Sequence, residues 1–344
     1  MSHSYEPKVC NTCQRVFKTI DNFLENTERW RICDQGHLWF NCSCGSTNII
    51  IKGKYDWYDP ETLLSKDSRS IFNLLGGLKE LPHVPTYVMK IEQLIDDETT
   101  SSADLAKAIK QAPIFAAKIL NTVNSSAFAK RQKIEGLEHA ISYIGRDYIK
   151  DYILIAILNT FKFKTKDFSP KIFWEQAFLT GVLAEFIGKK IGSSIDTGHL
   201  YVAGALANLG KIVQAMISPE ETDKLYKMIN SPDSLATWEK GEKILAIPKH
   251  TLLGEIGGVF WGIPPYIIQG IMHHNISPEG IKNHDELTLI IALANQLSHW
   301  ILLQPHLSKE EQVDALLKHF KLEQKDGEQI VDSILYDKEA KLIV

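Results

Sequence analysis

Five cysteines are the residues of this chain with the clearest potential for metal chemistry. All lie within the first 44 of the 344 residues: Cys10 and Cys13 form a CxxC pair, Cys42 and Cys44 form a CxC pair, and Cys33 lies between them. In a chain without a visible secretory signal, clustered cysteines indicate a metal site rather than disulfides. We expect Cys10, Cys13, Cys42 and Cys44 to bind a structural zinc ion, because thiolates suit a closed tetrahedral site.

Other ligand sets remain open for this zinc site. Cys33 or His37 could replace one of the four cysteines, and free buried thiols without any metal are the simpler alternative. A redox pair at Cys10 and Cys13 is poorly supported, because no βαβ pattern surrounds it.

Short strands must position these cysteines. Residues 30–33 and 37–40 are apolar stretches separated by a turn that contains Gly36, and residues 47–51 are rich in β-branched side chains. A sheet of this size buries too little apolar surface to fold alone, so a zinc ion would supply the missing stability. The pattern predicts a small β domain that resembles a zinc ribbon.

The rest of the chain has the helical period. From residue 68 onward, apolar residues recur three and four positions apart. Ser101 or Ser102 caps one helix, and residues 201–217 read as one apolar core helix rich in small side chains. Near the C-terminus, Ser308 and Glu311 have the spacing of a capping box.

We therefore expect a mainly α protein with three parts. Residues 1–60 form the zinc-ribbon-like β domain, residues 66–305 form an all-helical domain, and residues 306–344 form a polar helical tail. The tail is expected to pack on the main domain or on a partner.

Composition excludes some classes of partner. The chain is 44% hydrophobic and 23% charged, with a net charge of −4, which is ordinary for a soluble protein. This balance gives no electrostatic reason to bind nucleic acid or an anionic membrane. We see no apolar run of the ~18 residues that a membrane span needs, and we expect a cytoplasmic protein.

The helical part resembles the HDOD domain family, a bacterial relative of the HD metal-dependent phosphohydrolases. The resemblance covers roughly residues 70–300 and rests on motifs at fixed spacing. Ala112 departs from the pattern, since the family usually has Asp before this proline. The matching motifs are Leu81-Pro82 with Val84-Pro85, Asn124-Ser125 with Ala127-Phe128, Leu137-Glu138-His139-Ala140-Ile141 with Ile144-Gly145, and Leu209-Gly210-Lys211.

The resemblance implies a cavity that has lost most of an enzyme's metal ligands. The HD enzymes use a His, an adjacent His-Asp pair, further histidines and a final Asp. An amide is a weaker ligand for divalent ions than a carboxylate, and without an ion no bound water of lowered pKa is available. The resemblance therefore implies a protein that is not an enzyme. The corresponding positions of this degenerate HD site are Gln176, Ala207, Asn208, His250, His273, His274 and Asn295.

Residual chemistry at this site remains an alternative. His250, His273 and His274 could bind a transition metal together with Glu175 or Glu255. However, His273 and His274 point about 100° apart on a helix, so one is expected to pack while the other faces the cavity.

We expect a non-catalytic signalling or scaffolding protein. Its helical domain would bind a signalling partner protein, or a small-molecule or nucleotide ligand beside Asn208 and Asn295, and the zinc domain would add a contact surface. The first alternative is a divergent metal-dependent phosphohydrolase or phosphodiesterase. The second is a nucleic-acid-associated regulator acting through the zinc domain, which would require a steeply salt-dependent affinity.

Overall fold

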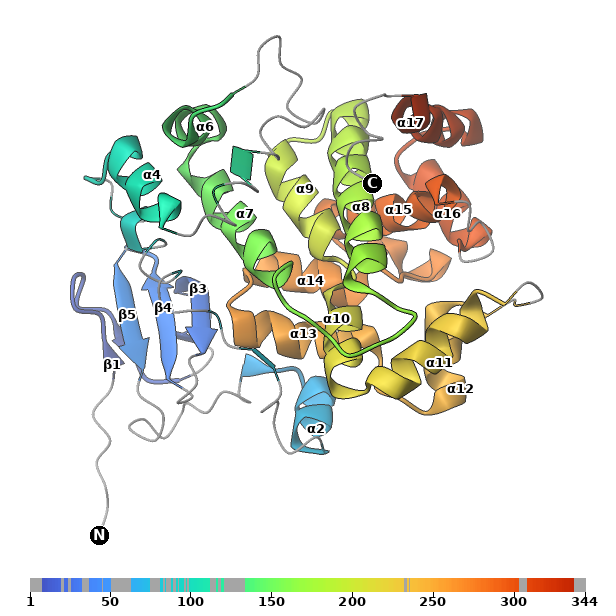
Figure 1. The fold of residues 1–344 in the computed structure, drawn as a ribbon, viewed down its shortest axis with the longest axis horizontal. Helices are drawn as coiled ribbons and strands as arrows, with labels where there is room; N and C mark the ends of the chain where they lie inside the picture. Colours follow the sequence, from blue (N-terminus) through green and yellow to red (C-terminus); the bar gives the residue numbers. More distant parts are fainter. Residues whose placement is uncertain are drawn as a thin grey trace.

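The computed structural model confirms a mainly helical protein with a small β region near the N-terminus. In Figure 1 the strands stand beside the helical domain. Cys33, Ala112 and residues 124–128 lie outside the described part of the chain. The structure describes residues 8–19, 22–23, 26–32, 37–44, 46–50, 63–74, 81–82, 84, 88, 91, 93–95, 97, 99–111, 116, 119–120, 134–231, 234, 236–302 and 308–336.

The three predicted strands form an antiparallel sheet in the order β3-β4-β5, with Trp30 opposite Phe40 and Phe40 opposite Asn48. A short antiparallel hairpin, which the sequence did not predict, precedes the sheet and carries the CxxC pair between its strands. Phe17, Phe23 and Phe40 meet edge to face with centroids 4.9–5.8 Å apart. The strands are β1 Lys8–Val9, β2 Val16–Phe17, β3 Thr27–Ile32, β4 Leu38–Cys42 and β5 Thr47–Ile50.

The helical region follows the predicted periodicity. Ser101 caps α4, since its hydroxyl accepts a hydrogen bond from the backbone N–H of Asp104 at 3.1 Å. The helices are α2 Lys66–Leu74, α4 Ser102–Lys110, α6 Leu137–Ile144, α7 Arg146–Leu158, α8 Pro170–Ile191, α9 Thr197–Leu206, α10 Leu209–Ile217, α11 Pro219–Ile229, α12 Trp238–Leu245, α13 His250–Trp261, α14 Pro265–His273, the 3-10 helix η3 Pro278–Asn283, α15 Glu286–Ile301, α16 Glu310–His319 and α17 Gln324–Tyr336.

Small residues let α8 and α9 pack with their backbones close together. A Cβ added to Gly181 would lie 2.7 Å from the carbonyl oxygen of Tyr201, and one added to Gly204 would lie 2.8 Å from that of Thr180. Helix α15 packs against α8 and α9, and its residues from 287 to 299 are buried. These three helices form the centre of the core.

The predicted single core helix over residues 201–217 is wrong, because it breaks at Ala207–Asn208. Helix α9 ends at Leu206 and α10 begins at Leu209, with Asn208 at φ −94° and ψ 16° as its N-cap. The break is stabilised from another helix, since the amide of Asn208 donates to the side-chain oxygen of Asn295 at 2.6 Å. The segment Thr197–Ile217 is long and apolar enough to span a membrane, but 89% of its most apolar window is buried, as in a core helix.

Helix α13 connects the N-terminal segments to the helical domain. It packs against β3, α2, α10 and α14, and Figure 1 shows it between the sheet and α10. The buried carboxylate of Glu255 accepts hydrogen bonds from the backbone N–H and hydroxyl of Ser65, at 2.7 and 2.6 Å, and from the hydroxyl of Ser68. The indole N–H of Trp261 donates to the carbonyl of Pro82 at 2.9 Å.

Removing the Glu255 carboxylate should loosen this connection. Glu255→Ala leaves three donors of Ser65 and Ser68 without their acceptor, and we expect a loss of about 1–3 kcal/mol of unfolding free energy. Thermal unfolding and hydrogen exchange across residues 63–74 would measure it. Glu255→Gln is the matched control, because it keeps one oxygen for the Ser65 N–H and should lose less. Equal stability of Glu255→Ala and the unmodified protein would contradict the prediction.

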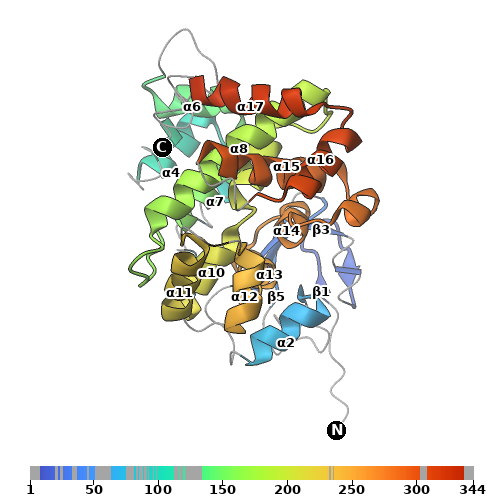
Figure 2. The same cartoon turned by 90° about the vertical axis from the view of Figure 1, so that its right-hand side faces the viewer.

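The tail begins differently from the predicted capping box. Lys309 is the N-cap of α16 without a side-chain cap, and the buried hydroxyl of Ser308 has no partner among the described residues. Lys309 is held instead by α15 and α12, since its N–H donates to Gln296 at 2.8 Å and its ammonium to Glu239 at 2.9 Å. Helices α16 and α17 pack on α15 and α8, and Figure 2 shows them far from α2.

Candidate functional site

The four predicted cysteines lie together between the β1–β2 hairpin and the β4–β5 turn. All four sulfurs are within 4.8 Å of one another, with Cys10 and Cys44 3.6 Å apart and Cys13 and Cys42 3.7 Å apart. Bonds of ~2.3 Å to a tetrahedral ion require sulfurs about 3.8 Å apart. The four sulfurs therefore fit a metal–thiolate site. Among the described residues, His37 is not part of this cluster.

Polar neighbours lower the pKa of Cys10 and Cys44 and so favour their thiolate forms. The hydroxyl of Ser46 lies 3.1 Å from the sulfur of Cys10 and 3.2 Å from that of Cys44. Burial raises the pKa of Cys10, but hydrogen bonds from Ser46 and backbone amides outweigh it and lower this pKa to about 5. The hydrogen bond from Ser46 also lowers the pKa of Cys44. Burial raises the pKa of Cys42 to about 12. A bound cation would favour deprotonation of all four.

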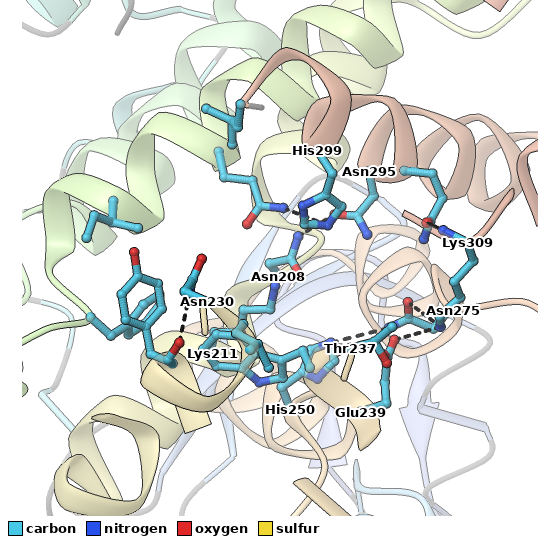
Figure 3. Close-up of a pocket in the computed structure, with 18 of the residues that line it drawn as sticks. Asn208, Lys211, Asn230, Thr237, Glu239, His250, Asn275, Asn295, His299 and Lys309 are labelled. Carbon is cyan, nitrogen blue, oxygen red and sulfur yellow. Dashed lines mark hydrogen bonds and ion pairs between the residues drawn. The ribbon is translucent and has the colours of Figure 1, made fainter. Parts of the chain in front are cut away.

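A second site is a cavity of about 210 Å³ bordered by α8, α10, α12, α13 and α15 (Figure 3). Pockets for drug-sized ligands usually measure ~300–1,000 Å³, so this one suits a small molecule. Its polar lining comprises Glu175, Gln176, Asn208, Lys211, Asn230, Thr237, Glu239, His250, Asn275, Asn295, Gln296, His299 and Lys309.

The structure brings together four of the seven residues that the family resemblance assigns to a degenerate HD site. Gln176, Asn208, His250 and Asn295 line the cavity from α8, the α9–α10 break, α13 and α15. Ala207 is fully buried and does not belong to the lining.

His250, which lines the cavity, forms a buried pair with His274, which does not belong to the lining. Their Nε2 atoms are 3.3 Å apart, and the amide nitrogen of Asn275 lies 3.4 Å from the first and 3.1 Å from the second. The Nδ1 of His250 lies 2.8 Å from the Glu242 carboxylate, and that of His274 donates to the carbonyl of Ile271 at 2.9 Å. Burial, together with nearby His250, lowers the pKa of His274 to about 3. Both rings are thus satisfied by protein groups.

His273 lies apart from this pair. Its ring is half-buried beside His284, with centroids 5.0 Å apart, and it is not in the cavity lining. Partial burial, with His284 adding to it, lowers its pKa. Glu255 is bonded to Ser65 and Ser68, and Glu175 pairs with Lys171 at 3.3 Å. The three histidines and two glutamates therefore do not form one metal site.

Two lysines enter the cavity in different electrostatic states. The ammonium of Lys309 pairs with Glu239. Burial raises the pKa of Glu239, but the positive charges of Lys309 and His250 outweigh this effect and hold the pKa far below its usual range. The ammonium of Lys211 lies 4.6 Å from the ring centroid of Trp238. Burial lowers the pKa of Lys211 to about 8, although Glu239 and Glu242 oppose this.

Sequence reasoning missed Lys211, Trp238 and Lys309 as cavity residues. The position of Lys211 could have been predicted from the sequence, because it follows Asn208 by three positions and side chains at that spacing share a helix face. The position of Lys309 could not have been predicted from local spacing, since it belongs to the tail and reaches the cavity through contacts with α12 and α15.

Comparison with known sequences identifies a family match. The HDOD domain model matches residues 81–277, more than half of the chain. A curated relative, an uncharacterized protein from Treponema pallidum (strain Nichols), is 22% identical over 254 residues, which make up 73% of this chain and 48% of the relative. The chain thus spans about half the length of this relative.

Solved structures show the same helical fold. An HDOD domain protein of unknown function from Geobacter sulfurreducens has a TM-score of 0.59 at 17% identity, covering 82% of this chain and 97% of its own. A candidate phosphohydrolase from Shewanella amazonensis SB2B has a TM-score of 0.60 at 15% identity with the same coverage. A candidate signal transduction protein from Marinobacter aquaeolei VT8 has a TM-score of 0.55 at 18% identity, covering 79% of this chain and 60% of its own. Identities this low establish the fold alone.

Proposed function

Because the chain belongs to the HDOD domain family, we propose that it is a non-catalytic signalling protein whose helical domain binds a small ligand in the cavity of Figure 3. The observation that carries the proposal is the chemistry of that cavity. The family resemblance assigns Gln176, Asn208 and Asn295 to positions of metal ligands in the HD enzymes, and these neutral amides line the cavity.

The hydrogen bonding supports binding rather than hydrolysis. The amides of Asn208 and Asn295 bond to each other at 2.6 Å, and the rings of His250 and His274 are satisfied by Glu242, Asn275 and a backbone carbonyl. Activating a water at neutral pH needs an ion held by several basic ligands. These side chains are already bonded to protein groups.

The N-terminal cysteines have a structural part in this proposal. Cys10, Cys13, Cys42 and Cys44 hold zinc, which stabilises the sheet that packs on α13. Thiolates held in this way suit a reducing, cytoplasmic setting. The ribbon-like domain (1–60) and tail (306–344) then offer surfaces to a partner protein, while the domain between them (66–305) holds the ligand. The name of the Marinobacter structure supports a role in signal transduction.

A hydrolysis assay tests the non-catalytic proposal. We expect no turnover of bis(p-nitrophenyl) phosphate or p-nitrophenyl phosphate with added Mn²⁺ or Fe²⁺, because the ring nitrogens of His250 and His274 contact Glu242, Asn275 and the carbonyl of Ile271. The control is the same protein with His250→Ala and His274→Ala. Metal-dependent turnover that this double variant loses would establish the phosphohydrolase alternative instead.

A further inference from the structure

We propose that the ligand of the cavity is a small organic anion. Its carboxylate or phosphate group would bind Lys211, and a hydroxyl or amino group beside it would donate a hydrogen bond to Asn208. This identification of the ligand class rests on the proposed binding function of the cavity.

Lys211 is the first observation. Its side chain is 5% exposed, it lies in the first turn of α10 and it lines the cavity. Among the described residues, no carboxylate lies within 4.0 Å of its ammonium, which instead contacts the face of the Trp238 ring. A buried charge is costly unless it is paired. An anion in the cavity would supply that partner.

The two nearby acidic groups make their hydrogen bonds to residues other than Lys211. Glu239 of α12 pairs with Lys309 at 2.9 Å. Glu242 of the same helix accepts from the ring of His250 at 2.8 Å and from the amide of Gln214 at 2.6 Å. The other carboxylate oxygen of Glu242 has no hydrogen-bond partner among the described residues, and Glu239 and Glu242 attract Lys211 without forming an ion pair with it. Lys211 is therefore a buried cation without a carboxylate in direct contact.

Asn208 is the second, independent observation. It is 3% exposed, its amide nitrogen donates to Asn295, and its side-chain oxygen has no donor among the described residues. A buried acceptor without a donor destabilises the protein, so a ligand that donates a hydrogen bond to it gains affinity. Figure 3 shows Asn208 and Lys211 at the same cavity, so that one ligand can contact both.

Size and stacking favour a compact anion over a nucleotide. The cavity of about 210 Å³ lies below the ~300–1,000 Å³ of drug-sized sites. One face of Trp238 is covered by Lys211, and its indole N–H donates to Gln214 at 2.9 Å. Sugar phosphates and hydroxy acids fit this description.

Calorimetry and thermal shift with defined probes test the ligand class. Inorganic phosphate and glycerol 3-phosphate test binding of a phosphate group, and lactate tests binding of a carboxylate. Glycerol, which is uncharged, and AMP, which is a nucleotide, serve as comparison compounds. We expect at least one small anion to bind the unmodified protein and to lose about tenfold or more of its affinity in Lys211→Met. Lys224→Met is the matched control, because Lys224 is exposed on α11 and outside the lining.

The melting temperature of Lys211→Met distinguishes a loss of binding from a loss of folding. Lys211→Met removes a buried charge without an anionic partner, so the ligand-free variant should unfold at the same temperature or higher. Affinity of the unmodified protein should also fall between about pH 7 and pH 9, since the pKa of Lys211 is about 8 and the ammonium is lost above it. Lys211→Met should lack this pH dependence.

The outcomes separate this inference from the proposed function. Binding of AMP or glycerol with equal affinity to the unmodified protein and Lys211→Met would overturn the ligand class but leave the cavity as a binding site. Absence of binding by every anion at millimolar concentration would also overturn it. Metal-dependent hydrolysis in the separate assay would instead overturn the non-catalytic function.

Discussion

Replacing Cys13 and Cys42 with serine is expected to release one zinc ion per chain and to unfold the N-terminal sheet. Hairpin strands β1 and β2 have two residues each, and the aromatic core is small. A structural zinc site contributes an apparent ~10–16 kcal/mol of binding free energy, while whole domains are stable by only ~5–15 kcal/mol. Without its metal, this sheet has too little buried surface to remain folded.

Elemental analysis of protein purified without added metal measures the first effect. Hydrogen exchange measures the second, and we expect protection to disappear across β3–β5 and to weaken in α13, on which β3 packs. Far-ultraviolet circular dichroism should retain the helical signal. Cys33→Ser is the matched control and should keep its zinc. Zinc retained by the double variant, or lost from Cys33→Ser, would contradict the ligand set.

Gly210→Ala is expected to destabilise the helical domain strongly. The added Cβ would lie 1.6 Å from the carbonyl oxygen of His250 and 2.7 Å from the backbone nitrogen of Gly254. These are backbone atoms of α13, so relief requires α10 and α13 to separate. We expect a loss of about 3–5 kcal/mol, the upper end for single substitutions. At ~2–4 °C per kcal/mol, the melting temperature should fall by roughly 10 °C.

A matched glycine elsewhere tests whether close packing is the cause. In Gly327→Ala on α17 the new Cβ would meet Leu317 at 3.4 Å, an ordinary contact, so the change should be neutral or stabilising by up to ~1 kcal/mol. Calorimetric melting of both variants gives the comparison. Similar melting temperatures for the two would refute the close approach of α10 and α13. Gly210→Ala should also weaken ligand binding, since His250 and Lys211 flank the contact.

Local features of the sequence were sufficient for the fold class and for the metal cluster. Apolar spacing identified the helices, Ser101 marked the start of α4, and cysteine spacing identified four sulfurs that the structure places within 4.8 Å. Each of these signals operates over a few residues or within one small sheet. The family motifs added the overall helical arrangement, which the match over residues 81–277 confirms.

The cavity depended on contacts between residues far apart in the chain. The sequence predicted an unbroken helix through Asn208, whereas the structure has a break between α9 and α10 at this residue. The side chain of Asn208 is hydrogen-bonded there to Asn295, which is 87 positions away in the sequence. Lys309 likewise reaches the cavity by pairing with Glu239, 70 positions away. The sequence alone thus determined the mainly helical fold class and the cysteine cluster. Only the tertiary structure decided which lysine is neutralised and which remains available, because charge pairing depends on distances that local spacing does not encode.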